Sequence, residues 1–166
     1  MQKLEAFIGR IVDSVGVGLA VLLVLMVLNV SYDVMMRYIF QASSVGMQEM
    51  EWHLFSLIIL FGTGVALRHE GHVRVDFIYD RMSPKKKAVI NIGGTVFMLL
   101  PLALLIFFGS FEYVNDAWVT NEISEDPGGL PYRWIIKSMI PLSMAFLILS
   151  AVGYILKNIM LYREAK

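Results

Sequence analysis

The chain contains no cysteine and only five prolines among its 166 residues. The absence of cysteine excludes disulfide bonds and thiolate metal sites, although it does not decide the cellular compartment. Charge is also missing from long stretches, since four runs hold no Asp, Glu, Lys, Arg or His: 14–32, 54–67, 88–111 and 138–156. With 57% hydrophobic residues overall, this pattern excludes an ordinary soluble domain.

The length of these runs predicts how often the chain crosses a bilayer. A helix needs about 20 mostly apolar residues to span the hydrocarbon core. Three runs are long enough, and the second, with 14 residues, becomes so when Trp52 and His53 extend it into the headgroup region. We therefore predict an all-α integral membrane protein that forms one domain, residues 1–166. Its four transmembrane helices are expected at about 14–36, 48–67, 88–111 and 134–156.

The segment before the first run has a helical pattern of its own. Apolar residues recur at helical spacing in residues 1–13, and Lys3 and Arg10 are available for lipid headgroups. This pattern predicts an amphipathic helix that lies on the inner membrane surface.

Local signals refine the predicted spans. Asp33 and Arg37 are four residues apart, so we expect an ion pair on one helical face. Pro101 and Pro141 fall inside the third and fourth spans, where proline removes a backbone hydrogen bond and commonly bends a helix. The proline- and glycine-rich stretch 126–131 predicts a turn.

The distribution of basic residues predicts an orientation. Eleven of the fourteen lie in the two terminal segments or in the connection between the second and third spans, which places both termini in the cytoplasm. These eleven are Lys3, Arg10, Arg68, Arg74, Arg81, Lys85, Lys86, Lys87, Lys157, Arg163 and Lys166. The opposite side is acidic, with Glu112, Asp116, Glu122, Glu125 and Asp126, and it carries all three tryptophans, which favour the headgroup boundary.

Three histidines raise the question of a haem or metal site, because imidazole is the commonest metal ligand. His53 lies at one end of the second span, whereas His69 and His72 lie at the other, so one subunit cannot clamp a haem with them. Met50 also occupies the position where a carboxylate di-iron motif requires glutamate. We therefore expect interfacial or partner-contacting histidines and no bound metal.

Ionisable groups that could carry chemistry lie only near the membrane boundary. Glu49, Glu51 and His53 could form a proton relay, but solvated side chains in the headgroup region are the simpler interpretation. No ionisable residue falls at the midplane of any predicted span, whereas an ion-coupled carrier usually needs such a group or a broken helix there. The sequence shows no phosphate loop, catalytic nucleophile or nucleic-acid surface. We expect neither a catalytic nor a substrate-binding site.

Two stretches resemble a known family. The first comprises Arg37, Tyr38, Ile39 and Phe40, followed by Ser43 or Ser44 and by Glu49; the second comprises Gly62, Arg68, His72, Val73, Arg74, Val75 and Asp76. In order and spacing they resemble the small membrane subunit of tripartite ATP-independent periplasmic (TRAP) transporters. The chain departs from that family in having Gly46 and Met47 where a tryptophan often precedes the glutamate.

The resemblance implies a role in a three-part uptake system in a bacterial or archaeal cytoplasmic (inner) membrane. A periplasmic binding protein would capture a small organic anion, a large sodium-coupled subunit would move it, and this chain would be a non-catalytic scaffold that helps to dock the binding protein. It implies no cofactor here, because the coupling sodium would bind to the large subunit. The expected partners are both of those proteins and membrane phospholipids, and not nucleic acid.

Two groups of residues are candidates for partner contacts. For the outer side we assign Arg37, Tyr38, Glu49, Glu51, Trp52, His53, Glu122, Glu125 and Asp126. For the inner side we assign contacts with lipid headgroups or the large subunit to Arg68, His72, Arg74, Asp76, Lys85, Lys86 and Lys87. The alternatives are a haem- or quinone-associated membrane anchor of a respiratory complex and a small carrier that acts alone as a homo-oligomer.

Overall fold

A computed structural model describes residues 1–69, 71, 79 and 81–164 of the chain. Within these residues every regular element is helical, and four helices are long and apolar enough to cross a membrane. They are α1 (Gln2–Ile39), α2 (Val45–Arg68), the continuous unit of α4 (Pro84–Gly94), η1 (Thr95–Leu99) and α5 (Leu100–Val119), and α6 (Trp134–Glu164). The predicted all-α, four-helix class is confirmed. Each predicted span lies within one of these helices, and the membrane boundaries stay a prediction.

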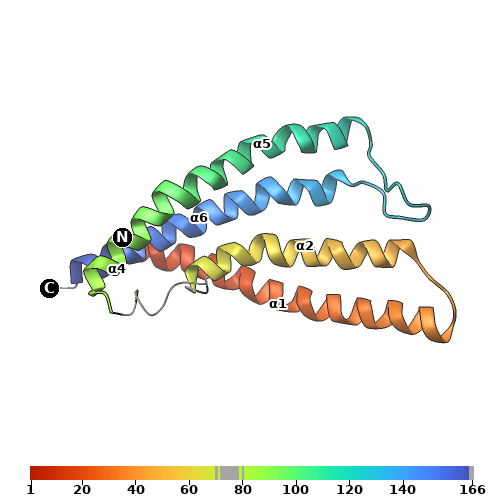
Figure 1. The fold of residues 1–166 in the computed structure, drawn as a ribbon, viewed down its shortest axis with the longest axis horizontal. Coiled ribbons are helices and arrows are strands. Elements are labelled where there is room, and N and C mark those ends of the chain that lie inside the picture. Colours follow the sequence, from red (N-terminus) through yellow and green to blue (C-terminus); the bar gives the residue numbers. More distant parts are fainter. Residues whose placement is uncertain (70, 72–78, 80, 165–166) are drawn as a thin grey trace.

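The helices form two hairpins that lie side by side (Figure 1). One hairpin is α1 with α2, and the other is α5 with α6. Both chain termini and α4 lie at one end, which we name the basic end, while the α1–α2 connection and the loop 120–133 lie at the other, which we name the acidic end (Figure 1). The structure therefore places both termini at the same end, and their cytoplasmic location stays a prediction.

The fourth helix, α6, is the most buried of the four and packs against α1, α2, α4 and α5. The first core cluster joins Ile8 and Val12 of α1 to Phe146 of α6, and the second joins Leu67 of α2 to Ala151 and Tyr154 of α6. Both clusters lie nearer the basic end than the acidic end, so this end holds the hairpins together by apolar packing.

Two glycines let these helices approach closely. A Cβ atom on Gly64 would lie 2.7 Å from the ring of Phe146, and one on Gly153 would lie 2.9 Å from the side chain of Ile8. Small residues are typical of such contacts in membrane proteins, where close van der Waals packing supplies much of the association energy. The core therefore depends on the absence of side chains at these two positions.

The N-terminal segment differs from the predicted surface helix. Residues 2–13 are the first turns of the continuous helix α1, because Ile8 and Val12 pack into the bundle core. Charged neighbours on the same segment also pair with the end of α2, as described below. The apolar stripe is thus used partly for packing within the chain, although Leu4 and Phe7 remain exposed.

The two prolines inside spans have different surroundings. Pro101 is the second residue after η1, a single π-helical segment, so the hydrogen-bond pattern of the third span changes shortly before the residue that lacks a backbone N–H. Pro141 lies inside α6, which continues as an α-helix through it.

Candidate functional site

Glu49 organises the acidic end. It lies near the start of α2, and only 7% of its surface is exposed. Its carboxylate accepts hydrogen bonds from the hydroxyl of Ser124 and from the backbone N–H of Leu130, both at 2.5 Å. Glu49 therefore ties the loop 120–133 to the other hairpin, and we name that loop the acidic loop.

Glycines allow the acidic loop to approach Glu49. Gly128 has φ of 85°, a left-handed conformation that residues with a Cβ rarely adopt. At Gly129 a Cβ atom would run into the side chain of Ser124 and lie 2.8 Å from a carboxylate oxygen of Glu49. The predicted turn at 126–131 is confirmed by the backbone hydrogen bond from Gly129 to Asp126.

A second carboxylate closes the base of the acidic loop. Glu122 forms an ion pair with Lys137 of α6, and its backbone carbonyl accepts a hydrogen bond of 3.1 Å from the N–H of Arg133. Lys137 also lies 4.0 Å from the ring centre of Tyr113 on α5. These contacts hold the two ends of the loop together.

Polar contacts also fix the outer end of the α1–α2 hairpin. Arg37 pairs with Asp33, which is only 2% exposed, so the predicted i, i+4 ion pair is confirmed. Asn29 donates a hydrogen bond of 3.0 Å to the carbonyl of Met47 across the hairpin. Tyr38 points away from the bundle and is among the most exposed side chains.

The three groups considered for a proton relay do not form one in the described part of the chain. The Nδ1 atom of His53 lies 2.6 Å from the backbone carbonyl of Glu49, not from a carboxylate. Its ring stacks on that of Trp52, with ring centres 3.9 Å apart. Both carboxylate oxygens of Glu49 are engaged by the acidic loop. Glu51 makes no hydrogen bond with either partner among the described residues.

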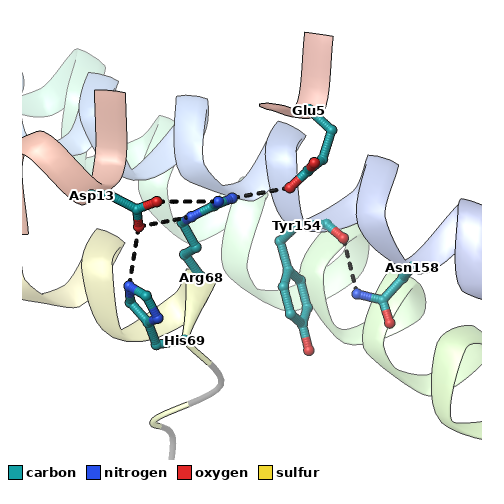
Figure 2. Close-up of polar contacts among 6 residues, drawn as sticks. All are labelled: Glu5, Asp13, Arg68, His69, Tyr154 and Asn158. Atoms are coloured by element: carbon teal, nitrogen blue, oxygen red, sulfur yellow. Dashed lines mark hydrogen bonds and ion pairs between the residues drawn. The ribbon is translucent and has the colours of Figure 1, made fainter. Parts of the chain in front are cut away.

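Arg68 is the centre of a charged cluster at the basic end (Figure 2). Its guanidinium donates to Glu5 at 3.0 Å and to both carboxylate oxygens of Asp13, at 3.0 and 3.3 Å. His69 lies 3.2 Å from the same Asp13 carboxylate. A Cβ atom on Gly9 would overlap the guanidinium, so glycine makes room for it. The cluster fastens the N-terminal turns of α1 to the end of α2.

An uncharged polar network lies beside this cluster, between α4 and α6. Asn158 is 1% exposed, accepts a hydrogen bond of 2.8 Å from Asn91 and donates one of 2.9 Å to the carbonyl of Tyr154. Figure 2 shows the second of these bonds. Asn91 also bonds the hydroxyl of Tyr79, which belongs to the connection before α4. The network thus satisfies polar groups that would be costly if buried unpaired.

The remaining predicted residues of the basic end divide into two sets. His72, Arg74 and Asp76 lie outside the described residues. The three lysines 85–87 occupy the first turn of α4, where the partial positive charge of the helix N-terminus disfavours cations. Lys87 lies 4.9 Å from the ring centre of Tyr79. Their placement against the helix dipole suits an anionic surface outside the chain.

Sequence reasoning missed the internal use of charge at both ends. Glu5 and Asp13 are 63 and 55 positions away from Arg68, so no local spacing signals their contacts. The Asn91–Asn158 contact carries no charge, and a search for ionisable groups passes over it. No group of three or more His, Cys, Asp or Glu within the described ranges could hold a metal ion.

Comparison with known proteins gives one family. A family model described as "Tripartite ATP-independent periplasmic transporters, DctQ component" matches residues 26–160, which is most of the chain. No curated protein matches.

Proposed function

The chain belongs to the DctQ component family of tripartite ATP-independent periplasmic transporters, and we propose that it is the non-catalytic scaffold for the large membrane subunit of such a transporter. The family match over residues 26–160 is the observation that carries this proposal. It gives no support to the alternative of a haem- or quinone-associated respiratory anchor.

The distribution of polar groups supports a scaffold rather than a carrier. Among the described residues, the ion pairs lie toward the two ends of the helices, and the runs between them contain no ionisable residue, although they include buried serine and threonine. Transport of an anion needs polar or ionisable groups near the midplane or a broken helix there. In our proposal the large subunit supplies the cargo site and the coupling sodium site, and it moves a small organic anion.

The outer helices supply surfaces for packing in the membrane. Large apolar side chains of α1 and α5, such as Val17, Leu28 and Leu105, are exposed in the isolated chain. Exposure of this kind carries no hydrophobic penalty in lipid, and it leaves room for helix–helix contacts. We assign the packing against the large subunit to these lipid-facing surfaces.

The acidic end is the proposed docking surface for the periplasmic binding protein. Glu125 and Asp126 are exposed on the acidic loop, and exposed apolar side chains of Trp118 and Ile123 lie close to them in the sequence. Glu49 and Glu122 do not contact the binding protein in this proposal. Their carboxylates bind other residues of the chain and hold the acidic loop in place. A loop held in place before binding loses less entropy on docking, which favours affinity.

Co-purification and uptake test the scaffold role together. A tagged chain extracted in mild detergent should bring a much larger multi-spanning protein with it in a fixed ratio. Deletion of the chain should abolish uptake of the organic anion, and a copy supplied in trans should restore it. A chain that purifies as a stable, isolated protein, together with uptake that survives its deletion, would show that the scaffold proposal is wrong.

A further inference from the structure

A groove opens between α2 and α6 in the half of the molecule nearer the acidic end. Its volume is about 400 Å³, within the range of small-molecule sites. The walls are apolar along most of its length, with Phe55 and Ile59 of α2 facing Ile136 and Ile140 of α6. Toward the acidic end the lining changes to aromatic rings and cations, namely Trp52, Tyr113, Arg133 and Lys137.

A second cavity of about 420 Å³ continues beyond this cationic end. It shares Trp52 and Arg133 with the groove, and its other walls include Gln48, Glu125 and Asp126. Three environments therefore follow one another: an apolar groove within the span, two cations at its end and carboxylates outside. This order matches an amphiphile with an apolar chain, an anionic group and a terminal cation.

Arg133 stands at the junction with unused hydrogen-bonding capacity. Its guanidinium lies 3.9 Å from Glu122 and 5.7 Å from the ring centre of Trp52, and it donates no hydrogen bond to any described residue. Lys137, in contrast, is engaged by Glu122. A guanidinium presents five N–H donors in a planar fork, and phosphate oxygens match that fork. A phosphate would therefore suit the N–H donors of Arg133 that its long ion pair with Glu122 leaves unused.

We propose that the groove binds one phospholipid with an ethanolamine headgroup. The acyl chain lies along Phe55, Ile59 and Ile140, the phosphate accepts hydrogen bonds from Arg133, and the ammonium donates to Glu125 and Asp126. An anionic headgroup that lacks an ammonium group would leave the carboxylates of Glu125 and Asp126 without a cationic partner. The proposal depends on insertion in a membrane and not on the transport role, so it can fail while the proposed function stands.

A lipid fits the whole groove better than a protein side chain does. An acidic side chain from another subunit would pair with Arg133 but would leave the apolar walls uncovered. An apolar helix would cover the walls but would add no acceptor for the donors of Arg133 that Glu122 leaves unused. The phospholipid satisfies both, and tryptophan and tyrosine rings are enriched at the headgroup depth where Trp52 and Tyr113 lie.

Lipid titration followed by native mass spectrometry tests the site. The membrane complex, delipidated in mild detergent, is titrated with phosphatidylethanolamine, phosphatidylglycerol and phosphatidylcholine. We expect one tight site for the ethanolamine lipid, about tenfold weaker in Arg133→Gln because charge-assisted hydrogen bonds are lost. Ile59→Trp, which fills the groove from its open side, should also abolish binding. Phe97→Trp, on an exposed position of η1, is the matched control and should leave binding unchanged.

Three results would overturn the proposal. The first is equally tight binding of phosphatidylglycerol, which would remove the role of the ammonium and the carboxylates. The second is binding that Ile59→Trp abolishes and Arg133→Gln does not change, which would remove the phosphate contact. The third is a crosslink between the large subunit and a cysteine introduced by Phe55→Cys, which is the only cysteine of the chain. Such a crosslink in the lipid-replete complex would show that the groove is a protein interface.

Discussion

At the scale of single residues, the chain uses buried carboxylates as internal fasteners. Glu49 accepts two hydrogen bonds from one loop, and Asp33 pairs with Arg37 on its own helix. The sequence predicted the second contact, because the i, i+4 spacing is local and visible. It could not predict the first, since Glu49 meets residues that lie 75 and 81 positions away. The predicted position of Glu49 at the membrane boundary suggested instead that its side chain is solvated.

Replacing Glu49 should loosen the acidic loop. In Glu49→Ala the hydroxyl of Ser124 can turn to solvent, but the N–H of Leu130 loses its acceptor, at a cost of about 1–3 kcal/mol. We expect a lower unfolding temperature of the solubilised complex and faster hydrogen exchange at residues 124–130. Asp116→Ala is the control, since an exposed side chain without described partners changes stability by about 0.5 kcal/mol or less. Equal exchange in both variants would refute the fastening role.

Arg68 should couple energetically to Asp13. Their side chains are partly exposed, so we expect a coupling free energy of about 0.5–1 kcal/mol from a double-mutant cycle with Arg68→Gln and Asp13→Asn. The measurement is the unfolding free energy of the complex in detergent. A second cycle with Arg163→Gln in place of Arg68→Gln provides the control, because Arg163 is an exposed cation of α6. A coupling free energy indistinguishable from zero would mean that the ion pair between Arg68 and Asp13 does not stabilise the contact between α2 and α1.

At the scale of helices, the hydrophobic pattern predicted which segments are helical, and packing decided how far they extend. The charge-free run 14–32 marks only the middle of α1, because Ile8 and Val12 continue the helix by packing on Phe146. Likewise the third span begins at Pro84, before its apolar run, and continues to Val119. Contacts between helices add ordered turns that apolar content alone does not reveal.

Close packing of α2 against α6 makes Gly64 sensitive to added volume. A Cβ there would meet the ring of Phe146 at 2.7 Å and the hydroxyl of Ser150 at 3.0 Å. Gly64→Ala should therefore cost about 1–3 kcal/mol through overpacking, measured as unfolding free energy in detergent. Gly62→Ala is the control, since no atom lies within 4 Å of its added Cβ.

The smaller side chain of Phe146→Leu should recover part of the loss when it is combined with Gly64→Ala. Such recovery identifies the clash with the ring as the cause. If Gly64→Ala and Gly62→Ala proved equally stable, the close approach of α2 and α6 would be wrong.

At the scale of the whole molecule, the two hairpins are joined differently along their length. At the basic end, the two apolar core clusters hold the hairpins together, whereas the polar contacts of Arg68 and of Asn158 each lie within one hairpin. At the acidic end, the main polar link is the contact of Glu49 with the acidic loop, and the groove lies between α2 and α6. The acidic end thus combines a loop held by Glu49 with the groove between α2 and α6.

The proposed docking of the binding protein on the acidic loop predicts that uptake is sensitive to charge at one end only. Glu125→Lys should raise the concentration of binding protein needed for half-maximal uptake, and adding Asp126→Lys should raise it to about tenfold, from roughly 1–2 kcal/mol of reversed surface electrostatics. The matched control is Glu164→Lys, an equal charge reversal on an exposed residue at the basic end. High salt should shrink the difference, because exposed charges are screened. If uptake depended on the concentration of binding protein in the same way in all three variants, the acidic loop would not be part of the docking surface. Co-purification with the large subunit would still test the scaffold role separately.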